Sequence, residues 1–344
     1  MEHYAGFDVS LELTSVCIVD ARGEIICEAK VPSEPEALIG FLNGQQLKIG
    51  RVGLEAGPLS QWLHAGLIAA GFETMLLETR HVKAALSAMT VKTDRRDARG
   101  IAQLLRLGWY RRVHAKSANA QEVRALLTSR KLMQGKLLDI ESGIRGVLRG
   151  FGLKVGLISR RRFETRIREL VDGHAILETV TDAMLGARAA LELEFKRLHR
   201  ELLGIVRADP VCRQLMSVPG VGAIVAITFK SGVDDPSRFK HSRDVGPHFG
   251  LTPRKYQSGE LDVTGSITKV GDRMVRTALY EAASVMLTRT VRFSSLKAWG
   301  MAVARRRGTK KARVAMARKL AVILHRMWVD GTDFRWSNQE SAIA

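Results

Sequence analysis

The chain has 344 residues, of which 46% are hydrophobic and 26% charged, a composition typical of a folded soluble protein with two or three domains. The sequence has no apolar run near the roughly 20 residues that span a bilayer, no signal peptide, and no metal or disulfide spacing among its three cysteines. We therefore expect a cytoplasmic location without a membrane partner. The net charge is +19, although residues 1–85 carry 11 acidic against 6 basic side chains. A positive field over the remainder favours nucleic acid as the partner over a merely well-solvated basic surface.

The first hundred residues alternate strand and helix patterns. β-Branched and apolar runs predict strands, and apolar residues at helical spacing predict helices between them. The predicted strands cover 4–9, 13–19, 24–27, 50–55 and 74–77, and the predicted helices cover 35–42 and 59–70 and begin again near Val82. Three consecutive strands followed by alternation favour an α/β fold, a mixed sheet with helices on its faces. The same order occurs in ribonuclease-H-like, or RuvC-like, domains, and we assign it to residues 1–110.

Strand patterns disappear between about residues 98 and 205. Apolar residues there follow a heptad-like spacing, as from Leu185 to Leu202, which predicts long helices and a coiled coil over 111–208. These helices carry many basic residues, for example in the segment 160–168. Two interpretations stay open: a scaffold pair of helices, or a dimerisation arm that also lies on phosphates.

A third region, assigned to 209–335 and followed by a tail over 336–344, is mostly helical by its pattern. Gly220 and Gly222 lie two residues apart between apolar helical stretches. That spacing is typical of a helix-hairpin-helix turn, where bare glycine backbone lets amides approach a phosphate, although a tight helix connection without a ligand gives the same pattern. Further along, a dense basic run is either a phosphate grip or a solvated face. Its residues are Arg305, Arg306, Arg307, Lys310 and Lys311.

Four acidic residues are the candidate metal ligands, namely Asp8, Glu55, Asp94 and Asp97. Asp8 and Glu55 end predicted strands, and Asp94 and Asp97 lie three residues apart, which places them on one helix face. Carboxylate oxygens are the ligands that Mg²⁺ prefers, and bound metals clamp the attacking and leaving oxygens of a phosphodiester. Three of the acids also have a structural explanation: Asp94 as a helix cap, Asp97 at the positive end of the helix dipole, and Glu55 paired with an arginine. Converging carboxylates repel unless a cation or proton is present, so we favour a metal site.

These acidic segments resemble the motifs of one known family. Gly6-Phe-Asp8, Leu54-Glu-Ala56 and Lys92-Thr-Asp-Arg-Arg-Asp-Ala98 resemble the three acidic motifs of the DEDD transposases, the one-ten family of bacterial insertion sequences. Segments 249–259 and 265–271 are similar to that family's second signature, and 218–222 resembles its helix-hairpin-helix element. Two departures, Leu11 in place of a common lysine and Gly57-Pro58 in place of a hydroxyl residue and glycine, indicate a subgroup.

The resemblance implies that Ser258 is a nucleophile, whereas its residue pattern alone is typical of a turn in a polar loop. In the implied mechanism the acidic quartet binds Mg²⁺, with Mn²⁺ as a substitute, and Ser258 attacks the scissile phosphate. A phosphoserine-linked DNA end results, which a 3′-hydroxyl later displaces. Basic residues near Ser258 in the sequence would stabilise charge on the phosphoryl oxygens. They are Arg254, Lys255, Lys269, Arg273 and Arg276.

The resemblance also implies the partners. These are double-stranded donor and target DNA, a non-coding guide (bridge) RNA, and further copies of the chain, as a dimer that forms a tetramer in the synapse. We expect the protein at the bacterial nucleoid, and the active site to be shared between subunits.

Three other functions are compatible with parts of this sequence. A hydrolytic nuclease on the same fold, such as a Holliday-junction resolvase, needs the acidic quartet but not Ser258. A sugar-kinase-like ATPase is disfavoured because no Gly-Thr-Thr phosphate loop follows Asp8. A non-enzymatic architectural binder predicts that Asp8→Ala leaves every activity intact.

Overall fold

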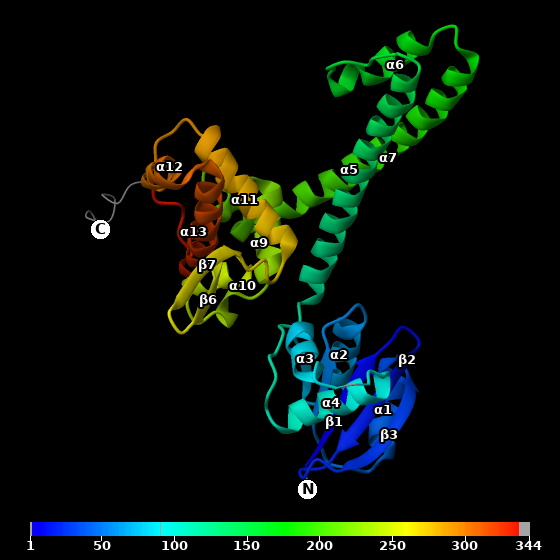
Figure 1. Cartoon of the computed structure of the whole chain (residues 1–344), viewed down its shortest axis with the longest axis vertical. Coiled ribbons are helices and arrows are strands. Elements are labelled where there is room, and N and C mark those ends of the chain that lie inside the picture. The colour runs from blue at the N-terminus through cyan, green and yellow to red at the C-terminus, as the bar shows by residue number, and fades with distance from the viewer. Residues whose placement is uncertain (1, 90, 337–344) are drawn as a thin grey trace. The chain divides into compact units, whose positions relative to one another are not determined.

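The computed structural model describes residues 2–89 and 91–336. The chain divides into two compact units, Met1–Lys116 and Ser117–Ala344, which run from blue to cyan and from there to red in Figure 1. The division into three domains expected from the sequence stays a prediction. The tail expected over 336–344 lies outside the described residues, apart from Trp336.

A five-stranded sheet forms the centre of the first unit. Its strand order is β3-β2-β1-β4-β5, in which β1 pairs antiparallel with β2, β2 antiparallel with β3, and β1, β4 and β5 run parallel. The elements are β1 His3–Val9, β2 Leu13–Val19, β3 Ile25–Pro32, α1 Pro35–Gly44, β4 Ile49–Glu55, α2 Ser60–Ala69, β5 Thr74–Leu77, α3 Thr79–Leu86 and α4 Asp94–Arg106. The mixed α/β sheet expected from the sequence is confirmed.

The two faces of this sheet carry different helices. Side chains alternate along a strand, so each strand contributes to both layers. On one face Phe7 packs with Leu38 of α1 and Leu63 of α2. On the other face Leu77 packs with Ile101 of α4. Successive residues of β1 and β4 therefore point alternately toward α1 and α2 on one face and toward α4 on the other.

Two long helices, α5 Ala118–Gly150 and α7 Ala175–Ala208, lie side by side in the second unit (Figure 1) and are called the arm below. Between them the chain forms η1 Arg160–Arg162 and α6 Phe163–Val171. Arg188 of α7 and Glu141 of α5 form a largely buried ion pair at 2.9 Å that ties the two helices together. Where α6 packs on the pair, apolar side chains form a separate core of Ile144, Leu148, Val155, Phe163, Ile167, Val171, Leu177 and Leu185.

The remainder of the second unit is mostly helical, as expected. Its elements are α8 Pro210–Leu215, α9 Ala223–Val233, η2 Pro236–Arg238, η3 Ser242–Asp244, α10 Val245–His248, β6 Pro253–Ser258, β7 Leu261–Ile267, α11 Arg273–Thr288, α12 Ser295–Arg307 and α13 Thr309–Asp330. Phe229, Leu279 and Leu320 are buried in its core, to which the arm contributes Leu127 and Leu202. Among the described residues, no helix combines the length and apolar character needed to cross a membrane.

One element differs from the expected polar loop around Ser258. Strands β6 and β7 pair antiparallel as a hairpin, with Ser258 opposite Leu261. Gly259 makes the turn with a φ of 54°, a conformation that glycine adopts at little cost. Almost every residue of both strands is exposed. Neither strand has a buried face, so the alternation of apolar and polar residues that reveals a strand in a sequence is weak here.

Candidate active site

The first two acidic residues end neighbouring parallel strands. In the register of β1 and β4, Phe7 lies opposite Leu54, and both side chains are buried against α1 and α2. The next residues along the two strands, Asp8 and Glu55, therefore face the opposite layer, where α4 lies. The pairing of the strands thus brings the two carboxylates together at the carboxyl-terminal ends of β1 and β4.

Gly6 allows α4 to lie directly on this face. A Cβ atom on Gly6 would stand 2.3 Å from both the Ala98 carbonyl oxygen and the Ala102 amide nitrogen of α4. Any side chain at this position would push the helix away from β1. Ala98 follows Asp97 directly, so the contact holds the first turn of α4 near the end of β1, where Asp8 lies.

A second contact anchors the same helix. Glu28 of β3 accepts a hydrogen bond of 2.8 Å from Arg99 Nη2 and also pairs with Arg95. The hydrogen bond from Arg99, aided by Arg95, lowers the pKa of Glu28 to about 2. One arginine of the third acidic motif, Arg95, and the following Arg99 therefore hold α4 on the sheet.

The start of α4 presents Asp94 and Asp97. Thr93, whose hydroxyl accepts a hydrogen bond from the Arg96 amide (3.3 Å), is the N-cap. Asp94 is therefore free of the capping role considered for it and is exposed. Asp97 Oδ2 lies 3.8 Å from Lys92 Nζ.

The carboxylates influence one another electrostatically. Burial raises the pKa of Asp8 to about 6, and Asp97 and Asp94 add to the shift while Lys92 opposes it. Burial also raises the pKa of Glu55, with further contributions from Asp8 and Asp97. In the described part of the chain Glu55 has no arginine partner, contrary to the alternative considered for it. The four acids thus share one local field of negative charge.

The donor set suits a hard divalent cation, because it consists of carboxylate oxygens only. Glu55 and Asp97 line a hollow of about 260 Å³ together with Lys83 and Lys92. Within residues 2–89 and 91–336, however, no three His, Cys, Asp or Glu side chains are already arranged to ligate an ion. The mutual repulsion of the acids is what a bound cation would relieve, and their side chains would have to draw together around it.

Ser258 lies in the second unit, at the end of β6 beside the hairpin turn. Its side chain is exposed, and it has no hydrogen-bond partner among the described residues. Tyr256, Leu261 and Val263 of the same hairpin are each more than half exposed. Among the described residues, no carboxylate of the hairpin hydrogen-bonds to the serine hydroxyl, so a base that activates it has to come into reach in another arrangement.

The basic residues expected around Ser258 have different surroundings. Lys255 Nζ lies 3.2 Å from Asp262 Oδ2 on the paired strand. Arg276 Nη1 donates hydrogen bonds to the carbonyl oxygens of Phe249 (3.0 Å) and Val270 (2.9 Å), so this side chain ties together the two ends of the hairpin segment. The others, Arg254, Lys269 and Arg273, are exposed.

The two glycines of the segment 218–222 differ in their surroundings. Gly220 has a φ of 85°, and a Cβ there would meet the Ala282 carbonyl oxygen of α11 at 2.5 Å. Gly220 therefore serves close packing between helices. Gly222 precedes α9, and no atom lies within 4 Å of a Cβ built on it. The amino end of α9 is thus open to a ligand at Gly222.

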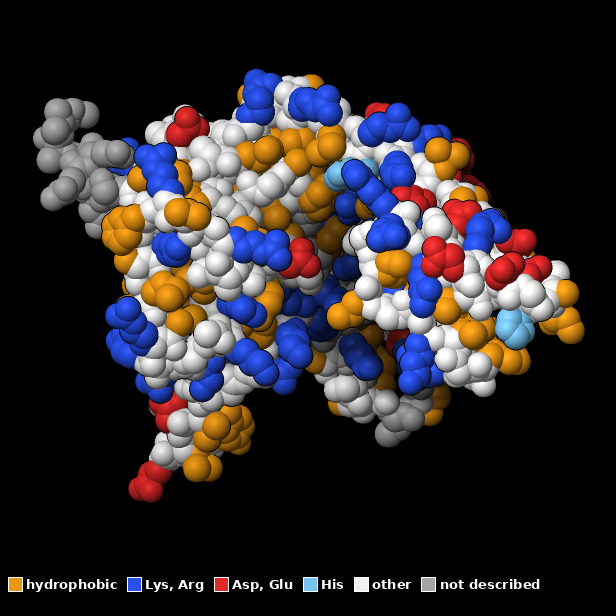
Figure 2. Space-filling view, turned by 90° about the horizontal axis from the view of Figure 1, so that it is seen from above, with side chains coloured by type: hydrophobic (Ala, Val, Ile, Leu, Met, Phe, Trp, Pro, Cys, Tyr) orange, Lys and Arg blue, Asp and Glu red, His pale blue; other side chains and the backbone are white. Residues whose placement is uncertain are grey.

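A basic corner joins the last two helices. Gly308, with a φ of 81°, connects the end of α12 to the start of α13. The five basic residues expected here are all exposed, namely Arg305, Arg306, Arg307, Lys310 and Lys311. Figure 2 shows Lys and Arg side chains over much of the face in view, with fewer Asp and Glu among them. This distribution agrees with the net charge of +19.

Three residues that support the acidic site were not singled out in the sequence. Gly6 had a usable signal, since an isolated glycine in an apolar strand often marks close approach of another backbone. No sequence pattern could have identified Glu28, because its partners Arg95 and Arg99 are about 70 residues away along the chain. Lys92 stands next to the acidic motif, but its ion pair with Asp97 depends on how the segment before α4 folds.

In the first unit, acidic residues at the ends of two strands face acidic residues at the start of a helix, and the second unit is mostly helical and basic. Enzymes that act on DNA combine these features. Comparison with known proteins makes this specific. The sequence profile described as "Transposase IS116/IS110/IS902 family" matches residues 212–298, and a DEDD transposase profile of the IS110 type matches residues 5–152. The chain belongs to this family of DNA transposases, and the expected family and enzyme class are confirmed.

Relatives cover most of the chain. The "Transposase for insertion sequence element IS1111A" of Coxiella burnetii is 28% identical over 326 residues, which is 93% of this chain and 87% of the relative. The "Probable family 20 transposase" of Pseudomonas aeruginosa is 26% identical over 329 residues, 93% of this chain and 94% of the relative. The "Transposase for insertion sequence element IS1328" of Yersinia enterocolitica is 30% identical over 142 residues, 41% of this chain and 42% of the relative.

Proposed function

We propose that the chain cuts and rejoins DNA at an insertion-sequence end through a covalent phosphoserine intermediate. The observation that carries the proposal is the gathering of Asp8, Glu55, Asp94 and Asp97 between two parallel strand ends and one helix start. The strand order 3-2-1-4-5, with the first three strands antiparallel, supports a RuvC-like fold for this unit. Such a site would bind the phosphodiester that is cut, and Ser258 would hold the cut DNA end covalently until it is rejoined.

In this proposal the acidic quartet holds Mg²⁺, or Mn²⁺ in its place. The ion supplies charge neutralisation and makes the scissile phosphorus more electrophilic. Lys92 compensates part of the negative charge at Asp97 while the site holds no substrate. Family membership implies use of a divalent metal, and the donor set of oxygens favours Mg²⁺.

Ser258 is the proposed nucleophile. Its Oγ forms a bond to phosphorus, the bond from phosphorus to the 3′ oxygen breaks, and the serine proton passes to a base while the 3′ oxygen takes up a proton. A 3′-hydroxyl of another strand then reverses these steps, so each phosphodiester lost is replaced by another. The exposed hairpin supports this role, because Ser258 is accessible to a strand of DNA. Ser258 and the acidic quartet belong to different units, and we propose that they meet across subunits.

The partners follow from the same proposal. Exposed cations near Ser258 and at the α12–α13 corner would bind phosphates of double-stranded donor and target DNA. Gly222 at the open amino end of α9 supports a helix-hairpin-helix contact with a phosphate. The paired helices α5 and α7 would serve as a coiled coil for assembly into a dimer and then a tetramer. A structured non-coding RNA would guide the complex, which acts in the cytoplasm at the nucleoid.

A suicide DNA substrate tests the proposal. Nicked DNA carrying the element end is incubated with the full chain and Mg²⁺, and covalent protein–DNA adducts are resolved under denaturing conditions. We expect adducts with the natural chain and none with Ser258→Ala, while Ser237→Ala, which changes another serine of the same unit, is the control. Cleavage by Ser258→Ala without an adduct would favour a resolvase-like nuclease. Cleavage unaffected by Asp8→Ala would contradict the metal-binding role proposed for Asp8, and binding without cleavage by the natural chain would leave only a DNA-binding role.

A further inference from the structure

The end of the arm at which α5 stops has an unusual charge composition. Residues 145–162 contain six basic side chains, Arg145, Arg149, Lys154, Arg160, Arg161 and Arg162, and no acidic one. The segment covers the last turn of α5, the connection 151–159 and η1. It is called the arm tip below. Like charges gathered in this way repel one another unless an anion neutralises them.

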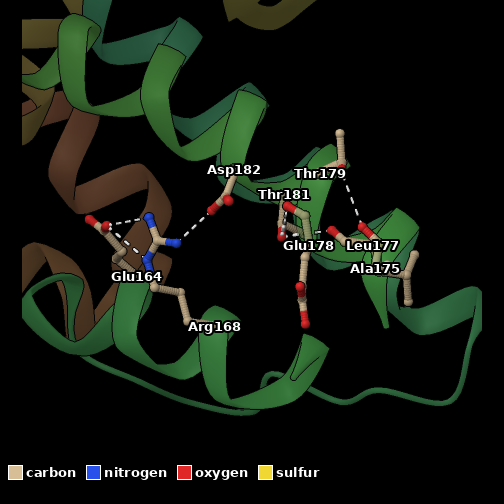
Figure 3. A network of polar contacts seen from close by, with 8 residues as sticks. All are labelled: Glu164, Arg168, Ala175, Leu177, Glu178, Thr179, Thr181 and Asp182. Atoms are coloured by element: carbon tan, nitrogen blue, oxygen red, sulfur yellow. Dashed lines mark hydrogen bonds and ion pairs between the residues drawn. The ribbon is translucent and has the colours of Figure 1, made fainter. Parts of the chain in front are cut away.

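On the rest of the arm and on α6, several basic residues are paired with nearby acids, although Lys131, Arg200 and Arg207 pair with no described residue. Figure 3 shows Arg168 of α6 between Glu164 and Asp182, at 3.0 and 2.5 Å. Arg197 pairs with Glu194 at 2.6 Å and Lys136 with Asp139 at 3.4 Å. At the arm tip, by contrast, four side chains have neither an ion pair nor a hydrogen bond with any described residue. These are Arg149, Lys154, Arg161 and Arg162.

Arg145 gives the arm tip a fixed shape. Its Nη1 donates a hydrogen bond of 2.7 Å to the Gly156 carbonyl oxygen, and its guanidinium lies 5.3 Å from the centre of the Phe163 ring. Gly156 has a φ of 73°, which lets the connection fold back on α5. The result is a hollow of about 250 Å³ lined by Arg145, Arg149, Leu153, Lys154, Val155 and Gly156. Three cations therefore border one small hollow.

Two large apolar side chains project beside these cations. Phe151 is 65% exposed, and Leu157 is completely exposed. An accessible aromatic ring among arginines and lysines suits a nucleic acid, because phosphates are attracted to the cations while an unstacked base can lie on the ring. An acidic protein would satisfy the cations but would give Phe151 no comparable partner.

We propose that the arm tip is a nucleic-acid binding site, in which Arg145, Arg149 and Lys154 bind a phosphodiester phosphate and Phe151 stacks on an adjacent unpaired base. The site anchors the nucleic acid away from the reacting phosphate. This proposal rests on the proposed function in one respect, that the partner of the chain is a nucleic acid. The backbone of DNA and that of RNA offer the same phosphate chemistry, so the test includes both.

The test compares two double variants of the full chain that lose equal charge. Arg149→Gln with Lys154→Gln removes two unpaired cations at the arm tip, and Lys136→Gln with Arg197→Gln removes two cations that are paired within the arm. Arg145 is left in place because it holds the connection. Fluorescence anisotropy measures the affinity for a 20-base-pair DNA duplex and for an RNA hairpin with an internal loop, across a series of salt concentrations.

We expect the arm-tip variant to lose about tenfold in affinity at physiological salt. The slope of log affinity against log salt should fall by about 0.9 for a duplex contact or about 0.7 for a single-stranded contact, which is the effect of losing one phosphate contact. The control variant should change less than twofold. Loss with only one of the two probes identifies the natural partner as DNA or RNA. Phe151→Ala should weaken binding of the looped RNA about tenfold without changing the slope.

Equal affinities and slopes for the two double variants with both probes would overturn the proposal. Adduct formation on the suicide substrate, measured in parallel at saturating DNA, separates this result from a failure of the proposed reaction. The arm-tip variant should still form the Ser258 adduct under those conditions. If the natural chain forms no adduct while the arm-tip variant loses affinity and slope, the reaction proposal is wrong and the arm-tip proposal stands.

Discussion

Replacing Asp8 with asparagine should stabilise the first unit while removing one proposed metal ligand. The Asp8 carboxyl is partly buried near Asp94 and Asp97, and its pKa is raised from 3.8 to about 6. A raised pKa means that the folded state disfavours the charged form. The contribution of Asp8 to stability is therefore fully present below pH 3.8 and is lost as the pH rises through about 6. Asparagine has nearly the same shape and no charge to lose.

The size of the effect follows from the shift. The difference between 3.8 and about 6 is about two pKa units, which at 1.36 kcal/mol per unit corresponds to about 3 kcal/mol. Water still reaches part of the side chain, so screening reduces this value, and we expect about 1.5–2.5 kcal/mol at pH 8 without divalent cations. Slowest-exchanging amides of β1 should then exchange about 10–100 times more slowly in Asp8→Asn than in the natural chain.

Hydrogen exchange with mass spectrometry, at pH 8 and near pH 4, measures this difference. Asp20→Asn is the control, because amides of Arg22 (2.8 Å) and Glu24 (2.9 Å) donate to the Asp20 carboxylate and lower its pKa against the effect of desolvation. Asp20→Asn should destabilise the unit at pH 8, and less so as the pH falls. If Asp8→Asn also destabilised β1 at pH 8, or stabilised it equally near pH 4, the raised pKa of Asp8, caused by burial and then by Asp97 and Asp94, would be refuted.

Gly6→Ala should destabilise the first unit by about 1–3 kcal/mol and abolish DNA cleavage, because α4 must move off β1; Gly40→Ala in α1, where nothing lies within 4 Å, should be neutral or stabilising in the same thermal melt. Adding 10 mM Mg²⁺ (about that concentration suffices for a weak carboxylate site) should slow β1 exchange at pH 8 in the natural chain and much less in Asp8→Asn, and chelation with EDTA should reverse it. Arg276→Lys should speed exchange in the β6–β7 hairpin, since lysine cannot serve both carbonyl oxygens in the same geometry; unchanged exchange there would show that the hairpin does not depend on Arg276.

Much of the acidic site could be predicted from the sequence because its determinants are local. The strand runs that end at Asp8 and Glu55 have the apolar, β-branched pattern of buried strands. The spacing of Asp94 and Asp97 places both on one face of a helix, provided that the segment is helical. Only the choice of cap was uncertain, since Thr93 and Asp94 are both suitable cap residues and the chain uses Thr93.

The hairpin that carries Ser258 could not be predicted in the same way. Its strands have no buried face, so hydrophobic alternation gave no signal, and Ser-Gly alone is typical of many turns. The role of Arg276 was also hidden. Its carbonyl partners, Phe249 and Val270, are separated from it by 27 and 6 residues and meet it only because the hairpin segment closes on α11.

The sequence by itself determined the order of strands and helices in the first unit and which acids are candidates, because these depend on residue type and short-range spacing. The family and the choice of Ser258 came from the resemblance of the motifs to a known family. Only the tertiary structure decided how α4 lies on β1 through Gly6 and that Glu28 holds α4 through Arg95 and Arg99. It also decided that four cations of the arm tip have no acidic partner among the described residues. Each of these depends on contacts between residues far apart in the chain. The energy of such contacts is set by burial and distance in the folded protein, which no local pattern encodes.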